Sequence, residues 1–218
     1  MMQSVRGPRR SWPLLVALLF VSDPAGAAGV DAARLSAAAV AGDWKQIQPM
    51  GTGALPELAR LYQASPEKDR ATIAYVFYSL GWKSPDAKRV LMADVHTQNQ
   101  TLRLQVQWAL GRVSNDVSVV DVLLDNMQND AQLLFRDKAA CALANDQIHL
   151  TPAQKVHLYE GLIRALDDPK VDVRRIAVTV LQIQTGQDKG FRFAGPPDAR
   201  TRAVEAWRQW LAEYRSQF

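Results

Sequence analysis

The sequence predicts an all-α fold built from repeated helical pairs, and three observations predict it. No segment keeps the period of two that a half-buried strand requires. Polar breaks divide residues 54–186 into eight runs with helical periodicity. An arginine recurs at a nearly constant spacing on every second run. The chain has 218 residues, 48% of them hydrophobic and 22% charged, which suffices for one domain with a hydrophobic core.

Residues 1–27 have the pattern of a cleavable signal peptide. Arg6, Arg9 and Arg10 form a positive n-region, residues 12–21 an apolar core, and residues 24–27 an A-x-A cleavage site. The apolar run is shorter than the roughly 20 residues of a membrane-spanning helix. We therefore expect a periplasmic or secreted protein that is not inserted in a membrane after signal removal. A buried helix or an uncleaved anchor is the alternative, and the Sec and twin-arginine routes both stay open.

Residues 28–53 are expected to form N-terminal capping helices. Their alanine-rich start favours helix, and Trp44 has the size to cover the exposed end of a stack of helices. The following Gly51-Thr52-Gly53 is too short for a phosphate-binding loop and follows no predicted strand. It is interpreted as a break between helices.

The eight helical runs alternate with short breaks that carry turn residues. Ser65, Ser84, Thr151 and Asp168 each precede a proline, which suggests an N-cap oxygen followed by a residue without an amide hydrogen. The predicted runs are residues 54–63, 67–81, 85–94, 99–112, 116–128, 131–145, 152–167 and 171–184. Eight runs form four consecutive pairs.

The second run of every pair carries the same register. Arg70, Arg103, Arg136 and Arg174 are separated by 33, 33 and 38 residues. Offsets of three and seven from each arginine lie on one helix face and are apolar. These apolar residues are Ile73, Val106, Ala139 and Ala177 at the first offset, and Phe77, Leu110, Leu143 and Leu181 at the second. The register predicts stacked pairs that bury a continuous core.

The fourth pair resembles a HEAT repeat. Its second run reads Val173-Arg174-x-x-Ala177-x-x-x-Leu181 after Asp167-Asp168-Pro169, and the run around Arg136 is similar. The resemblance covers about residues 54–186. It implies a right-handed α-solenoid of about four HEAT-like pairs, in which the second helices line the inner face.

Residues 187–218 resemble the ending of many exported bacterial HEAT-repeat proteins. A glycine and aromatic loop precedes a last helix in which Ala203, Trp207 and Trp210 share one stripe. We expect Trp207 and Trp210 to cap the last pair, with ligand binding as the alternative.

The sequence contains no recognisable catalytic or metal-binding motif. His96, His149 and His157 lie in different pairs and outside the usual metal-ligand spacings. Cys141 lies in an apolar run and is expected in the core. We therefore expect no catalytic residue, no metal and no cofactor. A HEAT-class enzyme or a cofactor- or metal-handling protein that uses Cys141, His149 or His157 is the alternative.

An aromatic stripe gives the functional prediction. Tyr75, Tyr78 and Trp108 are expected on the inner surface, with Trp82 close by, as anchors for a protein or peptide partner. Packing between neighbouring pairs is the alternative. The stripe holds one basic residue, Arg175, so nucleic acid is not expected. The predicted function is an exported scaffold or adaptor, with an envelope assembly factor as a further alternative and the oligomeric state open.

Overall fold

The computed structural model describes residues 31–144 and 149–218, and this part of the chain contains helices and no strand. The predicted signal peptide, residues 1–27, lies outside the described residues. The α-helices are α1 (Ala32–Ala41), α2 (Trp44–Ile47), α3 (Leu55–Ala64), α4 (Glu67–Leu80), α5 (Pro85–Ala93), α6 (Gln100–Val113), α7 (Val117–Asn129), α8 (Leu133–Ala144), α9 (Pro152–Ala165), α10 (Val171–Thr185) and α11 (Pro197–Arg215). Two short 3-10 helices, Gln48–Met50 and Thr52–Ala54, join α2 to α3.

The predicted all-α class and the eight predicted runs are confirmed. The runs correspond to α3 through α10, and their described ends agree within two residues. The agreement has a physical basis, since the turns that end the runs carry residues suited to them. Gly81 and Gly186 end α4 and α10 in the left-handed conformation, which glycine adopts without a steric penalty.

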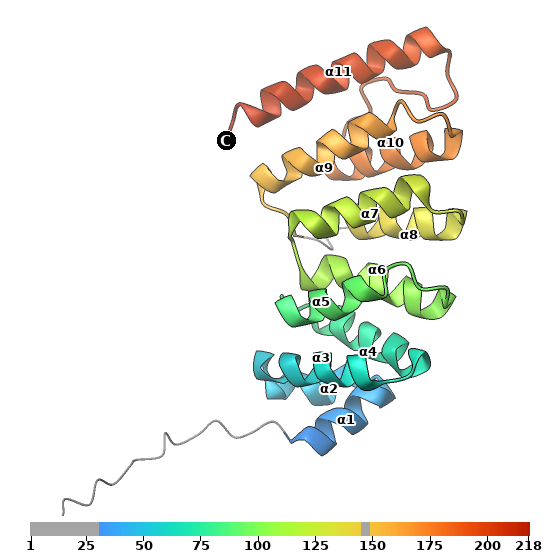
Figure 1. Cartoon of the computed structure of the whole chain (residues 1–218). Helices are drawn as coiled ribbons and strands as arrows, with labels where there is room; N and C mark the ends of the chain where they lie inside the picture. The colour runs from blue at the N-terminus through green and yellow to red at the C-terminus, as the bar shows by residue number, and fades with distance from the viewer. Residues whose placement is uncertain (1–30, 145–148) are drawn as a thin grey trace, which may run out of the picture.

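The helices stack in chain order from α1 to α11. Figure 1 shows α1 in blue at the bottom and α11 in red at the top. Each predicted pair packs together, as α3 with α4, α5 with α6, α7 with α8, and α9 with α10. The second helices also contact one another in the order α4, α6, α8, α10. Neighbouring pairs therefore share a surface along the length of the described chain.

The proline-preceding residues cap their helices in two of four cases. The Ser84 hydroxyl accepts a hydrogen bond from the Ala87 amide at 3.1 Å, and Thr151 forms a capping box with Gln154.

The prediction is wrong for the other two residues, Ser65 and Asp168. The Ser65 hydroxyl donates back to the Leu61 carbonyl of α3, and Pro66 occupies the N-cap position of α4. The Asp168 carboxylate accepts from the Lys170 amide and so stabilises the turn before α10 rather than the helix itself. In both places the helix begins later than the prediction requires, because the N-cap position is occupied by Pro66 before α4 and by Lys170 before α10.

The apolar register residues form the core. Ile73, Val106, Ala139 and Ala177, together with Phe77, Leu110, Leu143 and Leu181, are all 0% exposed. Burying side chains of this kind is the main favourable contribution to folding, at roughly 1.5–3 kcal/mol for a large aliphatic or aromatic side chain. The common register therefore reflects a common burial requirement.

The register arginines share a second role, which is to reach the next pair. Arg70 of α4 donates to Asp94, which follows α5, at 2.8 and 2.9 Å. Arg103 of α6 pairs with Asp130, which follows α7. Both carboxylates are largely shielded from water, so these ion pairs are screened less than surface pairs.

The last two register arginines continue the same scheme. Arg136 of α8 binds Asp172 in the first turn of α10 at 2.5 Å and the Asp130 carbonyl at 2.7 Å. Arg174 of α10 has no later pair to reach, and its Nε donates to the Phe193 carbonyl at 2.9 Å. The arginines thus connect each pair to the segment that follows it.

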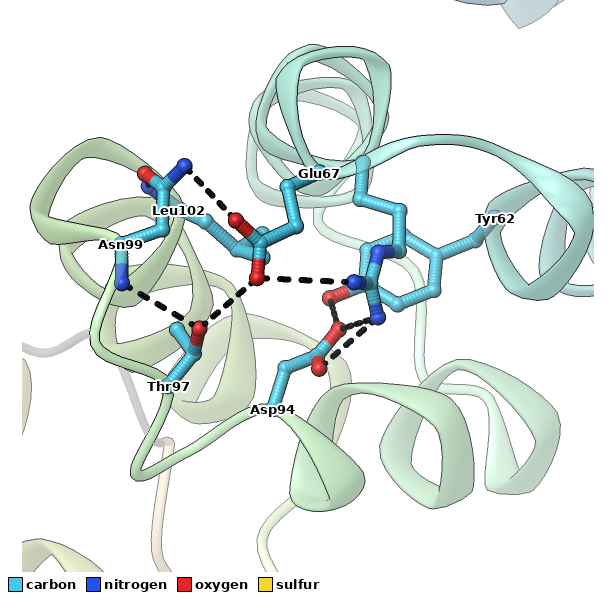
Figure 2. Close-up of polar contacts among 7 residues, drawn as sticks. Tyr62, Glu67, Asp94, Thr97, Asn99 and Leu102 are labelled. Atoms are coloured by element: carbon cyan, nitrogen blue, oxygen red, sulfur yellow. Dashed lines mark hydrogen bonds and ion pairs between the residues drawn. The ribbon is translucent and has the colours of Figure 1, made fainter.

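Figure 2 shows the first of these connections in detail. The buried Tyr62 of α3 donates its hydroxyl to Asp94 at 2.6 Å, beside the arginine contact. Glu67 at the start of α4 accepts from Thr97 and from the Asn99 side chain, which lie in the turn before α6. Polar contacts therefore fix the turn between α5 and α6 against the preceding pair.

Both ends of the stack are covered. Helix α1 packs on α3 and α4, and Trp44 of α2 is half-buried against the core. At the other end α11 packs on α9, and Trp207 is fully buried. Among the described helices, none is long and apolar enough to cross a membrane.

Candidate functional site

The four predicted aromatic residues occupy two environments. Tyr75 is exposed, with 40% of its surface accessible. Tyr78 and Trp82 are half-buried and pack against the core, and Trp108 is half-buried. The expected inner-surface aromatics are thus partly packing residues and partly open to solvent.

Two of these rings join neighbouring second helices. The Tyr78 ring on α4 and the Trp108 ring on α6 have centroids 6.0 Å apart and planes inclined by 38°. Such tilted pairs contribute about 0.5–1.5 kcal/mol beyond their buried area. Tyr75 and Trp82 make no ring contact within the described part of the chain, so the structure does not bring all four aromatics into one cluster.

Two cations lie over this aromatic pair. The Arg112 guanidinium lies 5.6 Å from the Tyr78 ring centroid, and its Nε donates to the Tyr78 carbonyl at 3.3 Å. The Lys138 ammonium of α8 lies 5.8 Å from the Trp108 ring centroid. These are cation–π distances. We call the surface of α4, α6 and α8 that carries Tyr75, Tyr78, Trp108, Arg112 and Lys138 the aromatic face.

The sequence analysis missed Arg112 and Lys138, although a signal for both was present. Arg112 follows Trp108 by four residues, so the two side chains are neighbours on α6. Lys138 lies 33 residues after Gln105, the repeat spacing, and Gln105 precedes Trp108 by three. Lys138 therefore holds the position on α8 that Gln105 holds on α6, one turn from Trp108. The repeat spacing and the helix period together place both cations near the aromatic residues.

A shallow hollow continues the aromatic face at the N-terminal ends of α4 and α6. It has a volume of about 290 Å³ and lies beside Tyr75. Its other lining residues are Lys68, Ala71, Thr72, Thr101 and Gln105. The hollow offers an apolar floor with one cation at its edge, which suits an inserted side chain.

A third cation, Lys83, lies near Arg112. Burial, and then the nearby charge of Arg112, lower the pKa of Lys83, while Asp116 acts in the opposite direction. The Lys83 ammonium also lies 3.5 Å from the Gly111 carbonyl of α6. Lys83 thus lies near one like charge, Arg112, and one opposite charge, Asp116.

Comparison with known proteins gives no identification. No protein-family model, curated protein or solved structure matches this chain. The register and its contacts are therefore properties of this chain's own residues, and the HEAT resemblance carries no support from a relative.

Cys141 is not the core residue that the sequence predicts. It is half-buried on α8, one turn after Asp137 and Lys138. Burial, and then the Asp137 charge, raise the pKa of its thiol, while Lys138 lowers it. A raised pKa keeps the thiol protonated, whereas a nucleophilic cysteine requires the thiolate.

Within the described residues, the histidines make no hydrogen bond with one another or with Cys141. His157 of α9 lies 2.6 Å from an Asp121 oxygen of α7, and both side chains are partly exposed. His149 is exposed in a left-handed backbone conformation. Within the described residues, no group of three or more histidine, cysteine or acidic side chains is placed to hold a metal ion.

The two predicted C-terminal tryptophans pack at the end of the stack. Trp207 is fully buried, and its ring centroid lies 5.3 Å from that of the half-buried Trp210. Trp210 lies 5.2 Å from Tyr159 of α9 and stacks on Tyr214. Tyr214 in turn donates its hydroxyl to the Pro152 carbonyl at the start of α9. The aromatic side of α11 is therefore used for packing against α9.

Proposed function

We propose that the chain is an exported, non-catalytic scaffold of the HEAT type that binds a protein or peptide partner through its aromatic face. The observation that carries the proposal is the aromatic face, whose rings lie on α4 and α6 and whose cations lie on α6 and α8. Tyr75 is 40% exposed, and Trp108 lies between Tyr78 and Lys138. Exposed aromatic and arginine side chains are the residues that most often anchor protein interfaces.

A right-handed solenoid of four HEAT-like pairs is part of this proposal. It is supported by the contacts between successive second helices and by the arginines that reach from each pair to the next segment. In such an arrangement the second helices line the inner face. The aromatic face belongs to second helices and therefore corresponds to that inner surface.

Export is the second part of the proposal. It is supported by the positively charged segment, apolar run and cleavage pattern of residues 1–27. Sequencing the N-terminus of the protein isolated from its natural source tests this part. We expect a mature chain that begins after Ala27, and an intact Met1 would contradict it.

The catalytic and metal-handling alternatives have less support. The pKa of the Cys141 thiol is raised, and its charged neighbours are Asp137 and Lys138 rather than a histidine. Metal analysis of the purified chain tests the metal-handling alternative, and a stoichiometric metal would favour it. An envelope assembly factor differs from the proposed scaffold only in the identity of its partner.

Affinity capture tests the proposed binding surface. The wild-type chain and a Tyr75→Ala/Trp108→Ala variant are used to capture proteins from an extract of the natural compartment. The matched control is Phe193→Ala/Phe218→Ala, which removes two exposed aromatic residues from the other end of the chain. We expect partners to be lost with the first variant and retained with the control. An unchanged set of partners with the first variant would overturn the proposal.

A further inference from the structure

The cations of helices α4, α6 and α8 fall into two groups. The register arginines Arg70, Arg103 and Arg136 each bind an aspartate of the following segment, so their charges are compensated within the molecule. Lys68, Arg112 and Lys138 make no ion pair within the described residues. All three lie on the aromatic face or at the edge of its hollow.

Two of these three cations, Arg112 and Lys138, lie over aromatic rings and are in no ion pair within the described residues. Arg112 is fixed by the Tyr78 ring and carbonyl, and Lys138 lies over the Trp108 ring. A ring orients a cation while leaving its remaining donors open to an acceptor. Less side-chain freedom is therefore lost when an anion binds, which favours binding.

Acidic residues are scarce at the corresponding positions of the same surface. Helices α4, α6 and α8 together carry six basic residues and three acidic ones, Glu67, Asp69 and Asp137, and Glu67 is occupied by Thr97 and Asn99. The face thus combines a net positive charge with apolar aromatic surface, although the chain as a whole has a formal charge of only +4.

This combination fits a partner that is acidic and also carries apolar side chains. We propose that the aromatic face binds an acidic peptide segment, whose carboxylates contact Lys68, Arg112 and Lys138 and whose apolar side chain enters the hollow beside Tyr75. The inference rests on the proposed function and names the chemistry of its partner. Complementary charge raises the rate and specificity of such binding, and the aromatic contacts supply most of the affinity.

Selection from a random library of 12-residue displayed peptides tests the inference directly. The selection is carried out on the wild-type chain at low salt, and the best binders are then measured by fluorescence anisotropy. We expect enrichment of aspartate and glutamate around an apolar residue. Replacing the carboxylates by amides, or raising the salt to about 1 M, is expected to weaken binding about tenfold or more, because at 1 M the screening length is only about 3 Å.

A charge-reversal variant connects the binding to the named residues. Lys68→Glu/Lys138→Glu changes two side chains that make no ion pair within the described residues. We expect its helical content to match the wild type and its thermal unfolding to shift only slightly, because the one contact removed is that of Lys138 with the Trp108 ring. The selected peptides are expected to bind it about tenfold or more weakly. The control is Arg164→Glu/Arg202→Glu, which has the same charge change. Arg164 is exposed on α9 and Arg202 is exposed on α11, and neither is in an ion pair within the described residues.

The outcomes separate this inference from the proposed function. In one outcome, the selected peptides show no enrichment of acidic residues and yet fail to bind Tyr75→Ala/Trp108→Ala. This result would overturn the proposal of an acidic partner but would agree with the proposed scaffold function. An absence of binders, or equal binding by all variants, would overturn the proposal of an acidic peptide partner. The affinity-capture experiment alone would then test whether the chain is a scaffold. Vesicles containing anionic lipid are a further probe. Binding of these vesicles in the absence of peptide binding, lost upon charge reversal, would overturn the peptide in favour of a membrane surface.

Discussion

Tyr62 of α3 donates its hydroxyl to Asp94, which follows α5, across 2.6 Å at the contact between two successive pairs. Asp94 also accepts two hydrogen bonds from Arg70 of α4. Tyr62 is only 1% exposed, so water cannot replace its acceptor. One carboxylate therefore joins three helices of neighbouring pairs.

Removing this carboxylate is expected to destabilise the fold strongly. Asp94→Ala leaves a buried hydroxyl without an acceptor and a largely buried guanidinium without its partner. We expect the free energy of unfolding to fall by about 2–4 kcal/mol in urea denaturation. Tyr62→Phe removes both the donor and the need for an acceptor, and it should cost only about 1 kcal/mol.

A surface acid provides the control for Asp94. Glu205→Ala on α11 removes an exposed carboxylate that lies 3.6 Å from Arg208, and it should change stability by less than about 0.5 kcal/mol. Equal losses in Asp94→Ala and Glu205→Ala would show that the buried contact does not join the pairs as described.

Gly161 marks a close contact between α9 and α7. A Cβ atom at this position would lie 2.3 Å from a methyl carbon of Leu124, which is itself buried. We expect Gly161→Ala to lower the free energy of unfolding by about 1–3 kcal/mol, since overpacking outweighs the gain in helix propensity of up to about 1 kcal/mol.

A double-mutant cycle isolates this contact. Leu124→Ala makes room for the new methyl group, so the double variant should be more stable than the sum of the two single effects predicts. Gly53→Ala is the matched control, because nothing lies within 4 Å of a Cβ there. Strict additivity of Gly161→Ala and Leu124→Ala would contradict the packing of α9 on α7.

The two kinds of tryptophan should respond differently to truncation. Trp207 is fully buried in the cap, and Trp207→Ala should cost about 3–5 kcal/mol. Trp108 is half-buried and loses mainly its contact with the Tyr78 ring, so Trp108→Ala should cost about 1–2 kcal/mol. Calorimetric or urea unfolding measures both losses. A larger loss for Trp108 would assign it to the core rather than to a binding surface.

Asp172 should make the contact between α8 and α10 sensitive to acid. Burial acts to raise the pKa of its carboxyl, but hydrogen bonds from Arg136 and from backbone amides outweigh burial, and the pKa is lowered from its ordinary value of 3.8. A lowered folded-state pKa contributes stability that is present above the unfolded value and is lost as the pH falls through the folded pKa.

The comparison of wild type with Asp172→Asn tests this pH dependence. The difference in their free energies of unfolding should be constant above about pH 5 and should shrink as the pH falls below the ordinary aspartate pKa, because protonated aspartate resembles asparagine. Arg136→Gln should remove most of the same pH-dependent difference. A difference between wild type and Asp172→Asn that is equal at neutral and strongly acidic pH would contradict the assigned contact.

The sequence predicts the helices and the core because burial repeats with the helix period. Ile73 and Leu181, over one hundred residues apart, obey one register and are both fully buried. The acceptors of the register arginines were not predictable in the same way. Asp94, Asp130 and Asp172 follow their arginines at different distances, because the turns between the helices differ in length.

The candidate site was predictable only in part. Tyr75 and Trp108 each lie five residues after a register arginine, so the register predicts that they share a helix face. Their exposure, however, depends on how closely neighbouring second helices approach. Lys138 and Trp108 belong to different pairs, so their contact follows from the stacking and not from either helix alone. Cys141 was expected in the core from its apolar neighbours, yet the helix rotation leaves it half-buried. The predicted signal peptide lies outside the described residues and stays a prediction.

Site-specific photo-crosslinking tests the central claim, that the aromatic face binds a partner, most directly. A photoreactive phenylalanine analogue replaces the exposed Tyr75 in cells that naturally make the protein, and a second variant carries it at the exposed Gln209 of α11. We expect irradiation to join a partner protein or peptide to the chain at position 75 and not at position 209. No crosslinked product at position 75, or equal products at both positions, would contradict the claim.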